Sequence, residues 1–123
     1  MGMSLKDELI EIEKGFWLAG VDEARAHLTD EVMLVFKQMK GVYSREQVAQ
    51  SMSDPNRWQD LRLSDVMVTQ PAENLALIGY EARAKRADGQ PYRCLAGSTY
   101  VRDGDTWKLA MHQHSELEPE AAA

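Results

Sequence analysis

Two histidines near the C-terminal end are the side chains of this sequence best suited to metal or acid–base chemistry. His112 and His114 stand two positions apart in a stretch typical of a β-strand, so both point to the same side of it. Metals use this spacing, but no third ligand is evident, and we therefore expect no metal. A near-neutral pKa would let either imidazole act as an acid or a base. We favour a dimer contact or a hydrogen-bond network on a sheet.

Asp65 is the acid that we consider for catalysis. It stands between Leu63 and Met67, where it would lean toward the interior of the protein. Burial would raise the pKa of such a carboxyl and allow it to act as a base. The alternative is that Asp65 faces water or caps a bend.

Amphipathic aromatic side chains are candidates for the lining of a ligand-binding cavity. Trp17, Trp58 and Tyr80, together with Tyr43 and Gln113, combine flat apolar surface with a few hydrogen-bonding groups. This mixture suits a small apolar ligand. Packing in a hydrophobic core would account for the same residues equally well.

Several motifs of catalysis and cofactor binding are absent from the sequence. It contains no Gly-x-Gly-x-x-Gly, no Gly-Lys-Ser/Thr phosphate loop, no Gly-x-Ser-x-Gly elbow and no Cys-x-x-Cys. We therefore expect no cofactor. Cys94 is the single cysteine, so it cannot form an internal disulfide, and we expect it to be a small buried residue of a strand.

Charge and hydropathy narrow the classes of partner. The chain has 14 basic and 20 acidic residues, a net charge of −6, and its basic residues are scattered. Nucleic acid is therefore not an expected partner. No apolar run approaches the roughly 20 residues that span a bilayer, so we expect no membrane association. With a lone cysteine, these features predict a cytoplasmic protein.

The positions of apolar and turn-forming residues predict one α+β domain over residues 1–123, frayed at 1–4 and 117–123. Apolar residues recur at helical spacing from Leu5 to Phe16, and residues 21–28 predict a second helix beyond Gly20. Residues 32–36 predict a short strand, and 44–52 a third helix that ends before Pro55. Four strands are then expected at 61–69, 75–87, 92–102 and 106–115.

Two turns set the register of the last three predicted strands. Asp88-Gly89 and Asp103-Gly104-Asp105 are typical hairpin turns. If they fix the pairing, one face carries a mainly apolar set that should pack under the helices: Ile78, Tyr80, Ala82, Leu95, Gly97, Thr99, Val101, Trp107, Leu109, Met111 and Gln113. The opposite face carries small and polar residues: Leu77, Gly79, Glu81, Arg83, Cys94, Ala96, Ser98, Tyr100, Lys108, Ala110, His112 and His114. We expect a homodimer through this second, outer face.

The closing hairpin carries a family resemblance. Residues 107–115, Trp-Lys-Leu-Ala-Met-His-Gln-His-Ser, preceded by Ser-Thr-Tyr-Val-Arg-Asp-Gly at 98–104, resemble the domain of unknown function 4440 and SnoaL-like group of the nuclear transport factor 2-like superfamily. The resemblance covers about residues 5–117 and implies a cystatin-like cone: N-terminal helices on a curved, mostly antiparallel sheet. It further implies a cavity between helices and sheet, and pairing through the outer sheet face.

The resemblance leaves three functions open, because this fold serves many chemistries. The first is a dimeric domain that binds a small molecule in an apolar cavity. The second is an isomerase, dehydratase or hydrolase that uses Asp65 or a histidine, and the third is a protein association module. Isomerase-like members use a tyrosine on the first helix, where this chain has Phe16 and Trp17. They also use an aspartate at the end of the first strand, where this chain has Phe36, Lys37 and Gln38, and an inward acid on the sheet, where it has Thr99. Hydrolase-like members need an Asp-Arg-Asp set inside the cavity. Asp65 is the only acid of this chain that we propose for such a set.

Overall fold

The computed structural model describes residues 3–18, 21–52, 54 and 57–118, and shows a helix pair, a short hairpin, a third helix and a long β-meander. The elements are α1 Leu5–Leu18, α2 Val21–Ala26, β1 Leu28–Val35, β2 Lys40–Ser44, α3 Arg45–Ser51, β3 Trp58–Ala72, β4 Leu75–Arg86, β5 Pro91–Asp103 and β6 Thr106–Glu116. The hairpin strand β2 was not predicted. The expected breaks at Gly20 and Pro55, and most of the two expected frayed ends, lie outside the described residues.

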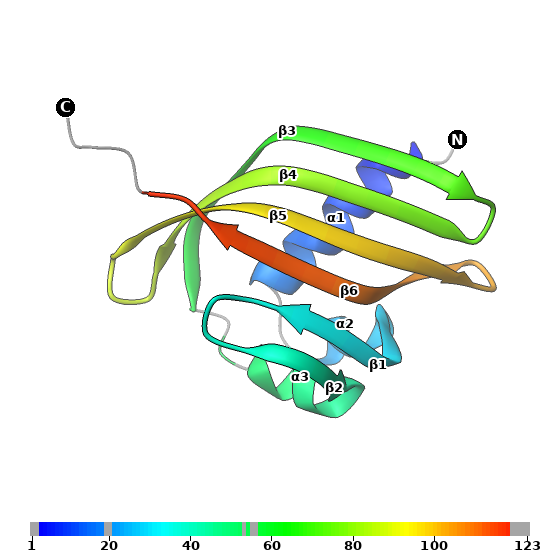
Figure 1. The fold of residues 1–123 in the computed structure, drawn as a ribbon, viewed down its shortest axis with the longest axis horizontal. Coiled ribbons are helices and arrows are strands. Elements are labelled where there is room, and N and C mark those ends of the chain that lie inside the picture. The colour runs from blue at the N-terminus through cyan, green and yellow to red at the C-terminus, as the bar shows by residue number, and fades with distance from the viewer. Residues whose placement is uncertain (1–2, 19–20, 53, 55–56, 119–123) are drawn as a thin grey trace.

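The strands form one curved sheet in the order β2-β1-β6-β5-β4-β3. Every pairing in it is antiparallel except that of β1 with β6. Helix α1 lies across one face of the long strands β3 to β6, while α2 and α3 accompany the β1–β2 hairpin (Figure 1). The predicted α+β class, with N-terminal helices on a curved and mostly antiparallel sheet, is confirmed. Among the described residues, no helix is long and apolar enough to cross a bilayer.

Local sequence signals explain where the helices begin and what they bury. The hydroxyl of Ser4 accepts a hydrogen bond from the Asp7 backbone N–H at 3.1 Å, which caps α1. Ser44 and Gln47 form a reciprocal capping box at the start of α3. Helix α1 buries Leu9, Ile12, Glu13, Phe16 and Trp17 against the sheet, so its apolar stripe contains one carboxyl group.

The β4–β5 turn is one residue longer than the sequence predicted. Lys85 pairs with Pro91, and the Arg86 N–H donates to the Gln90 carbonyl, so the loop holds three residues and ends at Gly89 with φ +87°. This left-handed glycine is typical of a three-residue hairpin loop. A one-residue change in pairing turns every side chain of a strand to the other face. The predicted faces of β5 are therefore wrong: Tyr92, Cys94, Ala96, Ser98 and Tyr100 point inward and are buried.

A bulge in β6 reverses the orientation of its C-terminal half. Tyr100 pairs with Leu109 while Thr99 pairs with Met111, which leaves Ala110 as an extra residue. Before the bulge Trp107 and Leu109 are buried, as predicted. After it, His112 and His114 face the helices and Gln113 is exposed. The outward orientation predicted for the two histidines is therefore wrong.

Candidate functional site

The centre of the interior is a buried carboxyl group surrounded by hydroxyl groups. Glu13 of α1 has no exposed surface. Its Oε1 accepts hydrogen bonds from the hydroxyls of Tyr80 and Ser98, the latter at 3.0 Å, and its Oε2 accepts one from Tyr100. The Trp17 indole N–H donates to the Tyr80 hydroxyl at 3.0 Å. Helix α1 is thereby joined to β4 and β5 through polar contacts at the middle of the sheet.

Burial and hydrogen bonding act in opposite directions on this carboxyl group. Burial raises the pKa of Glu13 above its ordinary value, although the hydrogen bonds from Tyr100, Tyr80 and Ser98 each lower it. The pKa values of Tyr80 and Tyr100 are raised by burial and by the nearby carboxylate. Both phenols therefore keep their protons at neutral pH and remain hydrogen-bond donors.

The two histidines extend this cluster toward the far side of the interior. His112 Nδ1 lies 2.5 Å from Ser98 Oγ and 3.7 Å from Glu13 Oε1. The two Nε2 atoms of His112 and His114 are 2.7 Å apart, and His114 Nδ1 lies 2.9 Å from the Tyr92 hydroxyl. A continuous series of polar contacts thus runs from Glu13 to Tyr92.

The hydrogen bonds of this series all run in one direction, because each imidazole has a single proton to donate. Burial lowers the pKa of His112 to about 4 and that of His114 further, so each imidazole carries one proton at neutral pH. Because Ser98 donates to Glu13, it must accept from His112 Nδ1–H. His112 Nε2 then accepts from His114 Nε2–H, and His114 Nδ1 accepts from Tyr92. Every donor in the series points toward the Glu13 carboxylate.

A small cavity lies beside the histidine pair. Its volume is about 80 Å³, and residues of α1, α3, β1, β6 and the start of β3 line it. The lining residues are Phe16, Trp17, Leu34, Phe36, Ser51, Met52, Arg57, Trp58, Leu109, His112 and His114. Ser51, Arg57 and the two histidines supply the polar groups of this wall, and the rest is aliphatic or aromatic. This is the composition of a site for a small, mainly apolar ligand.

Aromatic rings hold the cavity wall in place. Trp17 stacks on His114 with ring centres 5.0 Å apart and planes at 11°, and it contacts Trp58 edge-on at 5.1 Å. Phe36 also packs on His114, with ring centres 4.7 Å apart, and Trp58 lies 4.8 Å from Tyr92. Ring contacts at these distances stabilise one arrangement of the side chains. The imidazole of His114 is therefore held by contacts with two aromatic rings.

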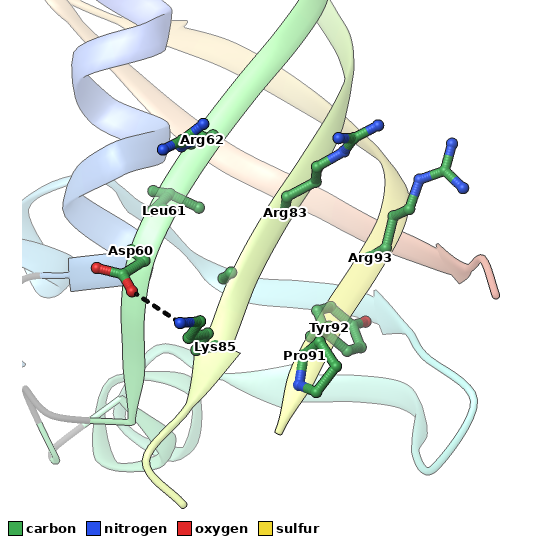
Figure 2. A pocket seen from close by; sticks show the side chains of 9 residues that line it. Asp60, Leu61, Arg62, Arg83, Lys85, Pro91, Tyr92 and Arg93 are labelled. Carbon is green, nitrogen blue, oxygen red and sulfur yellow. Dashed lines mark ion pairs between the residues drawn. The ribbon is translucent and has the colours of Figure 1, made fainter. Parts of the chain in front are cut away.

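A second, larger hollow lies on the sheet near the β4–β5 turn (Figure 2). It has a volume of about 530 Å³, and most of its charged side chains are exposed. Glu81 pairs with Arg83 at 3.0 Å and with Arg93 at 3.1 Å, and Asp60 pairs with Lys85 at 3.5 Å. Part of the charge of this hollow is therefore already paired within the protein. The cavity beside the histidines combines apolar walls with a few polar groups and is the better candidate site.

The structure brings together four of the sequence-predicted site residues. Trp17, Trp58, His112 and His114 all line the cavity. Tyr80 lies behind this wall, hydrogen-bonded to Trp17 and Glu13.

The other predicted site residues lie away from the cavity. Tyr43 is half-buried on β2 and packs against the core. Gln113 is exposed because of the β6 bulge. Asp65 is exposed at an irregular position of β3, with φ +54°, and its expected inward orientation is therefore wrong.

Sequence reasoning missed Glu13, Ser98, Tyr92, Tyr100 and Arg57. A signal for Glu13 was present, since a charged residue interrupts the apolar stripe of the first helix between Ile12 and Phe16. Such an interruption indicates a buried polar group that requires partners. Ser98, Tyr92 and Tyr100 lie on the strand whose faces were reversed. Arg57 follows the expected break at Pro55 and carried no signal that we can identify.

Known structures share this architecture at low sequence identity. A putative Ca/calmodulin-dependent kinase II association domain from Exiguobacterium sibiricum 255-15 superimposes with a TM-score of 0.76 and 18% identity over 98% of this chain and 99% of its own. A nuclear transport factor 2-like protein from Cytophaga hutchinsonii ATCC 33406 has a TM-score of 0.76 and 11% identity, over 94% of this chain and 100% of its own. A putative ketosteroid isomerase from Parabacteroides distasonis ATCC 8503 has a TM-score of 0.73 and 15% identity, over 94% of this chain and 90% of its own. No family model and no curated protein matches the sequence.

The order of elements and strands defines a class of small α+β proteins in which N-terminal helices pack on a curved, mostly antiparallel sheet. The particular fold is the nuclear transport factor 2-like, or cystatin-like, cone. At these identities the likeness establishes the fold alone, and the function has to be argued from the interior.

Proposed function

We propose that this chain is a small-molecule-binding domain that holds its ligand in the cavity beside His112 and His114. The observation that supports this most is a space of about 80 Å³ lined mainly by aromatic and aliphatic side chains together with a few polar groups. A core that serves only for packing has few voids larger than a water molecule. An interior that also contains oriented hydrogen-bonding groups is suited to holding a ligand in one orientation.

The size of the cavity limits the ligand. An engineered cavity of roughly 150 Å³ in another protein accommodates benzene. The space here is about half of that volume, so it fits a ligand of a few non-hydrogen atoms without rearrangement. A larger ligand would require side chains such as Phe36 or Met52 to move.

Ligand binding can be tested with the tryptophans of the cavity as reporters. Small ligands should change the fluorescence of Trp17 and Trp58 in a saturable manner. Leu34→Phe, which fills the cavity, should abolish this change, whereas the matched variant Leu77→Phe on the outer face should not. An unchanged response in Leu34→Phe would contradict binding in this cavity.

Acid–base catalysis is a second candidate, favoured by the series of donors that ends at Glu13. If a ligand displaced the hydrogen bond from His114, the Nε2 atom of the neutral His112 could accept a proton from that ligand, and Ser98 and Glu13 would stabilise the resulting cation. Deuterium incorporation into acetone or pyruvate in D₂O, followed by NMR, tests this activity. Exchange above the buffer rate should disappear in His112→Gln. Equal exchange in both proteins would refute His112 as the base.

The outer face of the sheet supports pairing with a second copy. Across the strands, Leu77, Thr99, Met111, Met33 and Val42 occupy successive paired positions and form an apolar row. Met33 is 46% exposed and Val42 is 56% exposed. Exposed apolar side chains that lie next to one another are a feature of interaction sites. The proposal therefore includes a homodimer through this row, and light scattering of the purified protein should give twice the mass of one chain.

A further inference from the structure

Arg57 is the one cationic side chain among the described residues that line the cavity. It is half-buried just before β3, and one of its Nη atoms donates a hydrogen bond to the Phe16 carbonyl of α1. Its Nε atom is fully buried and has no hydrogen-bond acceptor in the described part of the chain. An unpartnered N–H on a cation is costly inside a protein, because the group has given up water without gaining an acceptor.

Most of the other polar groups of the described cavity wall already have partners. Ser51 donates to the Val48 carbonyl at 2.6 Å, and the Trp17 indole N–H donates to Tyr80. The single proton of each neutral imidazole is used within the series that leads to Glu13, so neither His112 nor His114 has a free N–H for a ligand. The indole N–H of Trp58 is a neutral donor, so the guanidinium of Arg57 is the charged donor that the described wall leaves available.

The charges around Arg57 are unbalanced in favour of an anion. Burial lowers the pKa of Arg57, and nearby Asp54 raises it, but the side chain of Asp54 is exposed. The positive charge of Arg57 in turn lowers the pKa values of His112 and His114. An arginine keeps its proton under all ordinary conditions. A negative charge placed in the cavity would thus gain an electrostatic interaction that no group of the wall now supplies.

We propose that the ligand of this cavity is a small monocarboxylate, with its oxygens on the Arg57 guanidinium and its carbon body against Trp17, Phe36 and Trp58. This inference rests on the proposed ligand-binding function and adds the chemical class of the ligand. A planar carboxylate matches the fork of donors that a guanidinium presents. A phosphate, with more charge and more oxygens, would need further donors that this mainly apolar wall lacks.

Comparison of an acid with its amide tests the inference on the wild-type protein. Propionate and propionamide have the same shape, but only propionate is charged. Titrations followed by tryptophan fluorescence, with sodium chloride matched for ionic strength, should show propionate binding about tenfold to a hundredfold more tightly. Arg57→Gln should reduce this preference to near unity. The matched variant Arg62→Gln, in the larger hollow near the β4–β5 turn, should keep the preference for propionate.

Each outcome decides between the two proposals. Equal affinities for propionate and propionamide in the wild-type protein would overturn the carboxylate inference and leave the ligand-binding function intact. No saturable binding of either compound, or of larger acids and amides such as benzoate and benzamide, would contradict both proposals. The wild-type comparison remains decisive if Arg57→Gln fails to fold, and Arg57→Lys, which keeps the charge without the planar fork, should show an intermediate preference.

Discussion

Each face of the curved sheet contains an exception to the usual distribution of polarity. The face under α1, which is otherwise mainly apolar, encloses a carboxyl group, four hydroxyls and two imidazoles in one hydrogen-bond series. The opposite face, open to solvent, carries the apolar row from Leu77 to Val42, and Met67 beside it is 70% exposed. Stability alone favours apolar groups inside and polar groups outside.

Neither exception is expected from folding alone. A buried polar network contributes little net stability, because desolvation offsets the hydrogen bonds that it gains. An exposed apolar row likewise contributes to folding only when another surface covers it. The functions proposed above assign the inner network to ligand chemistry and the outer row to association. The following experiments test that division, beginning with the largest expected effect.

Removing the central carboxyl group should produce the largest loss of stability. In Glu13→Leu the Tyr100 hydroxyl loses its acceptor and the hydroxyls of Tyr80 and Ser98 each lose one, so we expect the free energy of unfolding in urea to fall by about 3–5 kcal/mol. Glu11→Leu, at an exposed position of the same helix, should change it by less than about 0.5 kcal/mol.

A rescue variant separates lost hydrogen bonds from poor packing. Adding Tyr100→Phe to Glu13→Leu removes a hydroxyl left without an acceptor, and part of the lost stability should return. If the double variant is no more stable than Glu13→Leu, the network is not the cause of the loss.

The histidine pair should make stability depend on pH. Folding lowers the pKa of His112 from 6.5 to about 4, so the unfolded chain binds the extra proton first as pH falls. Stability is therefore lost between pH 6.5 and pH 4, by about 3 kcal/mol for His112 at about 1.4 kcal/mol per pH unit. The lowered pKa of His114 acts in the same direction.

Glu13 acts in the opposite direction over the same range. Its folded-state pKa is raised, so the native protein takes up a proton as pH falls toward 4.5, which favours folding. Glu13→Gln removes this contribution and should steepen the acid loss in urea titrations at a series of pH values. His112→Gln should flatten it, and a wild-type slope in that variant would show that His112 is not buried in the neutral form.

The smallest effect on folding, but a clear effect on association, is expected on the outer face. Met111→Lys places a charge in the middle of the apolar row, so the dimer dissociation constant should rise at least about tenfold. The stability of the monomer should change by about 0.5 kcal/mol or less. Sedimentation over a concentration series measures both species, with Gln90→Lys in the exposed β4–β5 loop as the control. A dimer unaffected by Met111→Lys would have to form elsewhere.

Much of the architecture could be predicted from local signals. The apolar spacing from Leu5 to Phe16 predicted α1, and the β-rich second half predicted the meander. The register could not be predicted, because Asp88-Gly89 fits both a two-residue and a three-residue loop, and the structure has the latter. The turn at Asp103-Gly104-Asp105 was predicted as a three-residue loop, whereas Asp103 pairs with Thr106 and the loop has two residues. This error is opposite to the one at Asp88-Gly89, so the two cancel for the start of β6, and Trp107 and Leu109 face inward as predicted.

The site was predicted only in part, for the same reason. Trp17 and Trp58 owe their places to elements whose local pattern was clear, and both line the cavity. His112 and His114 were recognised as chemically important but placed on the wrong face, because nothing in the sequence around Ala110 distinguishes a bulge from a regular strand. Arg57 depends on a tertiary approach to Phe16 that no local pattern encodes.

The extra residue at Ala110 divides β6 into two halves with separate roles. The half before it completes the hydrophobic core, and the half after it supplies the imidazoles of the cavity. A regular strand of the same length, without the bulge, would turn Met111 and Gln113 inward in place of the histidines, without altering any side chain. In proteins of this shape, a local irregularity in the last strand can therefore determine the character of the interior as strongly as the composition of the strand does.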